Sequence, residues 1–130
     1  MGAFLCFVMD NTDFKIPEEV ADWVKAIGCA VTICDANGVI LYMNDLSRKT
    51  FAKHGNLIGQ NLFACHSERS RQMIRHMLAT GATNAYTITK GGIRKLIYQT
   101  PWRRNGEIAG MAEISIPLPA EMPHYDRDSQ

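Results

Sequence analysis

The first clear alternation of apolar and polar residues begins at Pro17, which suits the first turn of a helix. Two glutamates follow and favour the positive end of a helix, and Gly28 can end it. Between these signals, four apolar residues share one face at helical spacing: Val20, Trp23, Val24 and Ile27. The pattern predicts an amphipathic helix over residues 17–28. Residues 1–16 fit either a short strand or a contact with a partner, so their conformation stays open.

Two short apolar runs come next, at residues 30–34 and 39–43. The pair Asn37-Gly38 lies between them and tolerates the positive φ angles of a tight turn. We therefore expect the two runs to form an antiparallel hairpin.

The middle of the chain changes to helical spacing. Asn44 or Asp45 can cap a short helix that continues to about residue 53, and residues 58–63 then form an irregular connector with a helical turn. Ser67 is a second N-cap, for a helix that ends near Gly81. The apolar stripe of that helix comprises Met73, Ile74, Met77 and Leu78.

Strand patterns return in the last third, at residues 85–89, 94–102 and 108–116. Gly91-Gly92 and Asn105-Gly106 separate these runs and predict two further hairpins. Prolines from residue 117 onward cannot donate to a strand ladder, so the sheet should end there.

This order of elements predicts an α+β fold. Nothing in it requires parallel crossovers, so five antiparallel strands should form one sheet with the helices on one face. We expect an N-terminal segment with the amphipathic helix over residues 1–28, a sheet domain over residues 29–117 and an extended tail over residues 118–130.

Composition and charge restrict the classes of partner. A chain of 130 residues with 46% hydrophobic residues can bury one core. Its 14 Lys and Arg nearly balance its 13 Asp and Glu, which argues against direct nucleic-acid binding and against a membrane surface. The cysteines show no CxxC spacing and no basic stretch precedes the first apolar run, so we expect a cytoplasmic protein with reduced thiols.

Three segments form a recognisable pattern in this order: AVTICDANGVILYMN at residues 30–44, LIGQNLF at residues 57–63 and YQTPWRRNGEIAGMAEIS at residues 98–115. Together they resemble the PAS family of sensory and signalling domains. The resemblance implies a five-stranded antiparallel sheet around a small cavity, with the central helices as its lid. It also implies a role in sensing small molecules, redox state or light, or in passing signals between proteins. The family does not fix the ligand.

The PAS pattern implies that four strand residues face the cavity: Thr32 and Cys34, then Leu41 and Met43. From the helices, the wall would be closed by Phe51, Phe63, Met73, Ile74 and Met77. Ordinary core packing explains the same residues, so a small organic ligand and a filled core stay open as alternatives.

Polar residues on the predicted C-terminal strands are further candidates. Tyr86, Tyr98 and Gln99 would lie on strands that line the cavity, and inward polar atoms would need a ligand or a buried water. The alternative is that Tyr98 and Gln99 lie on opposite faces of the sheet.

Cys65 and His66 precede the second capped helix, where a thiolate would gain from the positive helix end. Either could be an axial haem ligand, but the chain has no CxxCH and one adjacent pair is no metal signature. No nucleophile-elbow, zinc or phosphate-loop motif is present, so we expect no enzyme activity and no metal site.

Three functions remain open at this level. The first is a ligand-responsive module that regulates a partner by shifting between two conformations. The second is an unliganded adaptor for protein interaction, and the third is a haem or redox sensor that uses Cys65 or His66. We also expect a homodimer formed mainly through residues 1–28, unless that segment folds over its own sheet.

Overall fold

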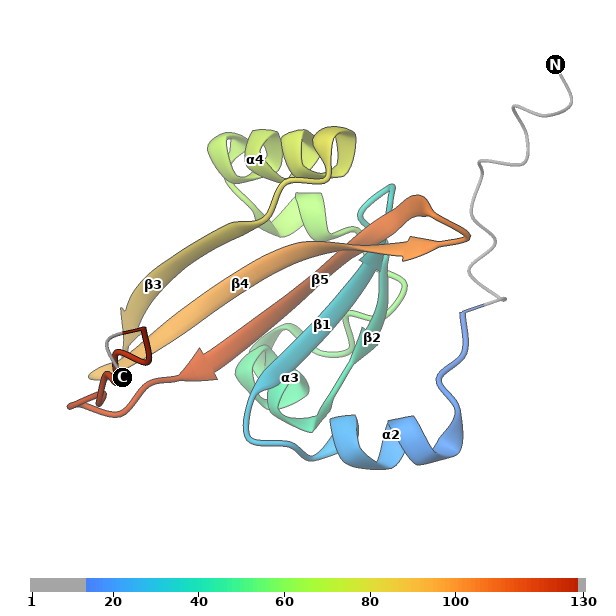
Figure 1. The fold of residues 1–130 in the computed structure, drawn as a ribbon. Coiled ribbons are helices and arrows are strands. Elements are labelled where there is room, and N and C mark those ends of the chain that lie inside the picture. The colour runs from blue at the N-terminus through green and yellow to red at the C-terminus, as the bar shows by residue number, and fades with distance from the viewer. Residues whose placement is uncertain (1–13, 129–130) are drawn as a thin grey trace, which may run out of the picture.

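A computed structural model describes residues 14–128, apart from the side chains of Glu19, Val20, Ala64 and Cys65. Its centre is one five-stranded antiparallel sheet with the strand order β2-β1-β5-β4-β3 (Figure 1). The strands are β1 (Ala30–Asp35), β2 (Ile40–Met43), β3 (Asn84–Lys90), β4 (Ile93–Arg104) and β5 (Glu107–Pro117). The predicted α+β class with five antiparallel strands is confirmed.

Helical elements connect and cover the strands. They are α2 (Glu18–Lys25), α3 (Asp45–Thr50), α4 (Glu68–Thr80) and two 3₁₀ turns, η2 (Ala52–His54) and η3 (Leu62–Cys65). The helix α3 packs against β1 and β2, and α4 packs against β4 and β5 (Figure 1). Both α-helices between β2 and β3 therefore pack on the sheet.

Local capping signals explain where the central helices begin and end. The Ser67 side chain accepts a hydrogen bond from the Ser70 amide at the start of α4, and Gly81 ends that helix with a left-handed φ of 79°. The Asn44 side chain caps α3 in the same way, through the Ser47 amide. The short helix ends at Thr50 and continues as a 3₁₀ turn, where the sequence predicted one helix to about residue 53.

The hairpin turns differ in how far the sequence predicted them. Asn105 and Gly106 have φ angles of 52° and 81°, as a tight turn of this type requires. In the first hairpin only Gly38 has a positive φ, because Asp35 organises the turn instead. Its Oδ1 accepts hydrogen bonds of 2.9 Å from the backbone amides of Asn37 and Val39.

One predicted cavity residue lies elsewhere because the β1–β2 ladder contains a register shift. Ile33 pairs with Tyr42, but Cys34 pairs with Ile40, so Leu41 is an extra residue on β2. Alternation is interrupted there, and Ile40 shares the buried inner face with Met43. The prediction that Leu41 and Met43 share that face is therefore wrong.

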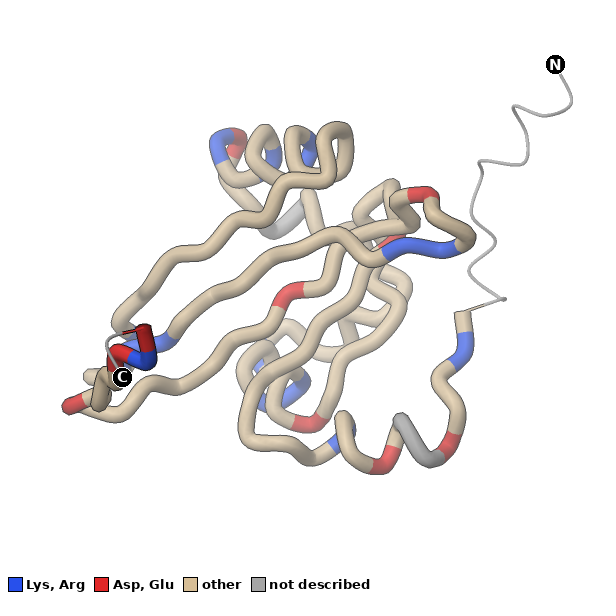
Figure 2. Tube along the Cα trace, viewed as in Figure 1, with Lys and Arg blue, Asp and Glu red and all other residues tan. Residues whose placement is uncertain are grey.

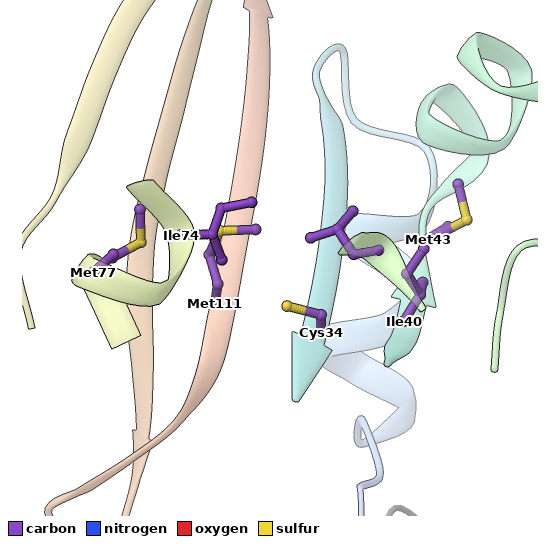
Figure 3. Packing of buried hydrophobic residues seen from close by; sticks show 7 residues of the cluster. Cys34, Ile40, Met43, Ile74, Met77 and Met111 are labelled. Carbon is purple, nitrogen blue, oxygen red and sulfur yellow. The ribbon is translucent and has the colours of Figure 1, made fainter. Parts of the chain in front are cut away.

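The hydrophobic core lies between the inner face of the sheet and the central helices. Its buried members come from β1, β2 and β5 and from η3 and α4: Cys34, Ile40, Met43, Leu62, Ile74, Met77 and Met111 (Figure 3). Three of these residues are methionines, whose flexible side chains adapt to irregular gaps in a core.

The N-terminal helix is shorter than predicted. It begins after Pro17 and ends at Lys25, three residues before Gly28. Val24 is buried against the domain, whereas 59% of Trp23 is exposed. No helix in the described part of the chain has the length and apolar character needed to cross a bilayer.

Candidate functional site

The inner face of the sheet carries a row of polar residues that crosses four strands. Register places Thr32 on β1 beside Glu113 on β5, Glu113 beside Gln99 on β4, and Gln99 beside Asn84 on β3. Because directly paired residues point to the same side of a sheet, these four side chains share the inner face. The row is thus fixed by strand pairing between residues far apart in sequence.

Hydrogen bonds along this row all run in one direction. Asn84 Nδ2 donates to Gln99 Oε1 at 3.0 Å, and Gln99 Nε2 donates to Glu113 Oε1 at 2.9 Å. An ionised carboxylate can only accept, so the Glu113 contact fixes the orientation of the Gln99 amide. Gln99 is only 4% exposed, and both ends of its amide are satisfied within the protein.

A cavity of about 430 Å³ lies over the inner face, next to this row. The sheet contributes Thr32, Tyr86, Ile97, Glu113 and Ser115, among others. The rest of the lining comes from the edge strand β2 and the segment after it, through Met43, Phe51, His54, Leu57, Leu62 and His66. Its volume is in the range of small-molecule sites, and its lining is mostly apolar with a few polar groups.

The polar groups that line the cavity differ in how many hydrogen bonds they already form within the protein. The hydroxyls of Thr32 and Ser47 lie 2.6 Å apart and share a hydrogen bond. Glu113 uses one carboxylate oxygen for Gln99, and no ion pair to it is formed by any Lys, Arg or His in the described residues. Burial, followed by the nearby Glu113 carboxylate, raises the pKa of the Tyr86 hydroxyl. Tyr86 therefore stays a hydrogen-bond donor at neutral pH.

His66 borders both the cavity and a neighbouring groove between α4 and β3. Its Nδ1 lies 2.9 Å from the Leu62 carbonyl oxygen. A carbonyl can only accept, so Nδ1 carries the hydrogen and Nε2 is left as an acceptor in the neutral ring.

The predicted site residues fall into three groups. Thr32, Met43, Phe51, His66 and Tyr86 line the cavity. Met73, Ile74, Met77 and Gln99 lie along grooves beside α4, where Ile74 and Met77 also belong to the core. Cys34, Leu41, Phe63 and Tyr98 do not line the cavity, and the side chain of Cys65 lies outside the described residues.

Each of the four misplaced candidates has a physical reason. Cys34 is packed in the core, where burial raises the pKa of its thiol to about 11. Phe63 packs beside the core, and the Arg75 guanidinium lies 5.2 Å from its ring. Tyr98 is 39% exposed while its neighbour Gln99 is buried, so the alternative that the two straddle the sheet is the correct one. Leu41 is displaced by the register shift described above.

The residue missed by the sequence analysis with the most chemical interest is Glu113. It is the only charged side chain inside the largely apolar run GMAEISI of β5. A charged residue at an inward position of a strand is unusual, and that signal could have been used. Cavity residues such as His54, Leu57, Lys90 and Lys95 carry no comparable signal, because turns and neighbouring strands bring them to the site.

The described side chains contain no group of three or more His, Cys, Asp or Glu that could hold a metal ion. The arrangement is instead a partly open, mainly apolar cavity whose polar groups include the Glu113 carboxylate, the Tyr86 phenol, two imidazoles and two lysines. Such a space can hold a small molecule and orient it by hydrogen bonds.

Comparisons with solved structures return proteins with the same architecture. VqmA of Vibrio cholerae, in a complex with ligand and DNA, has a TM-score of 0.61 and 21% identity over 80% of this chain and 52% of that chain. The PAS domain of the histidine kinase ThkA has a TM-score of 0.57 and 14% identity, over 69% of this chain and 99% of that domain. The Aer2 receptor from Vibrio cholerae, described as a dual PAS-haem oxygen sensor, has a TM-score of 0.52 and 16% identity over 70% of this chain and 95% of that chain.

This chain therefore spans about half of the VqmA chain and nearly all of the ThkA domain. No protein-family model matches it, and no curated protein sequence does. At 14–21% identity these likenesses establish the fold alone.

Proposed function

We propose that this chain, which has a PAS-like fold as its sequence resemblance predicted, is a non-catalytic sensory module that binds a small, largely apolar molecule. The observation that carries this proposal is the cavity of about 430 Å³ between the sheet and the central helices. A fully packed core would leave only voids near the size of a water molecule. The sensory assignment is supported by structural neighbours that are themselves sensor domains or receptors.

A route from the cavity to the N-terminal helix supports a signalling role. Thr32 lines the cavity and is bonded to Ser47 of α3, whose amide is capped by Asn44. The Asn44 side chain in turn donates to the Val24 carbonyl of α2, at 2.9 Å. A ligand that moves Thr32 would therefore change the hydrogen bonds that hold α2 in place. A ligand that binds one arrangement of α2 more tightly than another would shift the populations of the two arrangements.

The output of the module would be a homodimer or a signalling partner that contacts residues 1–28. Trp23 on α2 is 59% exposed, which leaves a large aromatic side chain available for such a contact. VqmA is described as a dimer and as bound to ligand and to DNA. For the chain itself the near balance of charge still favours a protein partner over direct nucleic-acid contact.

Native mass spectrometry with an absorption spectrum tests the proposal on freshly purified protein. A small added mass without visible absorption is expected. A Soret band that is lost in His66→Ala would support the haem sensor instead, through the free Nε2 of His66. A bare mass that persists after exposure to a library of small apolar compounds would support the unliganded adaptor.

A pair of substitutions on one strand sharpens the test. Ser115 faces the cavity, whereas the adjacent Ile114 belongs to the opposite face of β5. Ser115→Phe should fill the cavity and abolish the added mass, while Ile114→Phe should retain it. Loss of the ligand in both variants, or in neither, would contradict binding at this cavity.

A further inference from the structure

The cavity contains a carboxylate whose hydrogen-bonding capacity is only partly used. Glu113 lies at an inward position in the middle of β5, between β1 and β4. In Figure 2 the charged positions gather on α4, on the turns and near the ends of the sheet, and little charge lies at its centre. Glu113 is half-buried there, so its carboxylate faces the cavity without being sealed from solvent.

The protein itself supplies Glu113 with one donor. Gln99 Nε2 donates to Oε1, and the Gln99 amide cannot turn around because its own oxygen accepts from Asn84. Glu113 Oε2 has no hydrogen-bond partner among the described residues. It is not a buried unsatisfied atom either, so it is open to the cavity or to solvent at its edge.

The rest of the lining is complementary to a molecule with an apolar body. Phe51, Leu57 and Leu62, together with Ile40 and Met43 of the edge strand β2, form an apolar part of the lining. Tyr86 adds a hydroxyl beside Glu113, and the carboxylate contributes to its raised pKa. The site thus offers the Glu113 carboxylate as an acceptor beside this apolar part of the lining.

We infer that the ligand of this cavity is a small, largely apolar amine whose nitrogen donates a hydrogen bond to the Glu113 carboxylate. The inference rests on the proposed ligand-binding function and narrows its ligand class. A protonated amine replaces the water lost by the carboxylate and forms a charge-assisted hydrogen bond. An apolar molecule without a donor would leave Glu113 Oε2 without a partner, and a carboxylate ligand would place two negative charges together.

Two lysines at the cavity define the competing arrangement. Lys90 and Lys95 lie on β3 and β4 near the hairpin that joins them, where they could attract an anionic ligand. Lys95 is four positions from Gln99 along β4, which is roughly 13 Å in an extended strand. They therefore act at the far end of the cavity from the Gln99–Glu113 pair, and Lys90 is exposed to solvent.

Three probes of similar shape distinguish a ligand with an amine from an apolar ligand and from an anionic one: phenethylamine, ethylbenzene and 3-phenylpropionate. Their dissociation constants are measured on the full chain by ligand-observed NMR and by titration of tryptophan fluorescence. We expect phenethylamine to bind at least tenfold more tightly than either other probe. Tighter binding of 3-phenylpropionate would overturn the inference in favour of the lysines.

Two variants assign the effect to its residue. Glu113→Gln keeps an oxygen for Gln99 Nε2, and it should weaken phenethylamine at least tenfold while leaving ethylbenzene unchanged. Lys95→Gln removes a charge from the same cavity and should weaken only 3-phenylpropionate. An amine preference that survives in Glu113→Gln would refute the role of Glu113. Thermal unfolding of each variant confirms that it is folded.

The outcome for the hydrocarbon distinguishes the inference from the function on which it rests. If ethylbenzene binds as tightly as phenethylamine, the inferred amine class is wrong, but the proposed binding of small molecules in the cavity is retained. Failure of all three probes, together with a bare native mass, would refute the proposed ligand-binding function itself.

Discussion

Replacing Asn44 by Ala should show how strongly one buried side chain holds three segments together. Asn44 is 1% exposed, and its Oδ1 accepts hydrogen bonds from the amides of Val31 and Ser47, at 2.9 and 3.1 Å. Its Nδ2 donates to the carbonyls of Val24 and Cys29, both at 2.9 Å. The side chain thus uses all of its donors and two acceptor positions to join α2, β1 and α3.

The magnitude follows from the groups that Asn44→Ala leaves unpaired. Loss of a helix N-cap costs about 1 kcal/mol. Each further buried backbone group without a partner adds about 1–3 kcal/mol, reduced where a water can enter the space left behind. We therefore expect a loss of about 3–5 kcal/mol in the free energy of unfolding, a large share of the roughly 5–15 kcal/mol typical of domains.

Asn61→Ala is the matched control because Asn61 caps η3 with the same side chain on the surface. Its Oδ1 accepts from the Phe63 amide at 2.8 Å, and its Nδ2 donates to the Asn37 carbonyl at 3.4 Å. Water can replace both contacts, so the loss should stay near 1 kcal/mol or below. Urea unfolding followed by tryptophan fluorescence measures both variants. Equal losses in the two would refute the argument that burial of the Asn44 network sets its energy.

Three further predictions concern packing, ionisation and assembly. Gly110→Ala should lower the free energy of unfolding by more than about 4 kcal/mol or prevent folding. A Cβ at this position would clash with the Cys34 carbonyl and lie 2.7 Å from Trp102 Nε1. Gly28→Ala is the control: a Cβ there would have nothing within 4 Å and should be tolerated in the same urea assay. Burial raises the pKa of the Cys34 thiol from 9.0 to about 11. As the pH rises, the thiol therefore loses its proton in the unfolded chain before it does so in the folded protein. The free energy of unfolding should then fall by roughly 1.4 kcal/mol per pH unit between pH 9 and 11. Cys34→Ala should remove this contribution and make the slope less steep, and an unchanged slope in chemical denaturation would contradict it. In light scattering the full chain should be a dimer and a chain that starts at Cys29 a monomer; two monomers would end the proposal of an interface in residues 1–28.

Signals confined to a few residues allowed much of the fold to be predicted. Ser67 and Gly81 mark the ends of α4 because capping needs one side chain and one permissive backbone position. Asn105-Gly106 forms the last hairpin turn for a similar reason. Together with the order of the apolar runs, these signals sufficed to predict five antiparallel strands, and the resemblance of three segments to PAS domains added the arrangement of the sheet around a cavity.

The register of β2 shows where local patterns fail. Alternation predicts that Leu41 faces inward with Met43, but the extra residue opposite Cys34 places Ile40 there instead. A shift of one residue exchanges the two faces of a strand, and only the pairing with β1 decides it.

The sequence by itself determined the elements of this protein, their order and the ends of α4, because capping, turn formation and apolar periodicity act over a few neighbouring residues. The tertiary structure alone decided which side chains surround the cavity. Thr32, Gln99 and Glu113 meet because β5 inserts between β1 and β4, so strands distant in the chain become neighbours. The acceptor role of Glu113 depends on that pairing and on the Gln99 amide that the pairing orients.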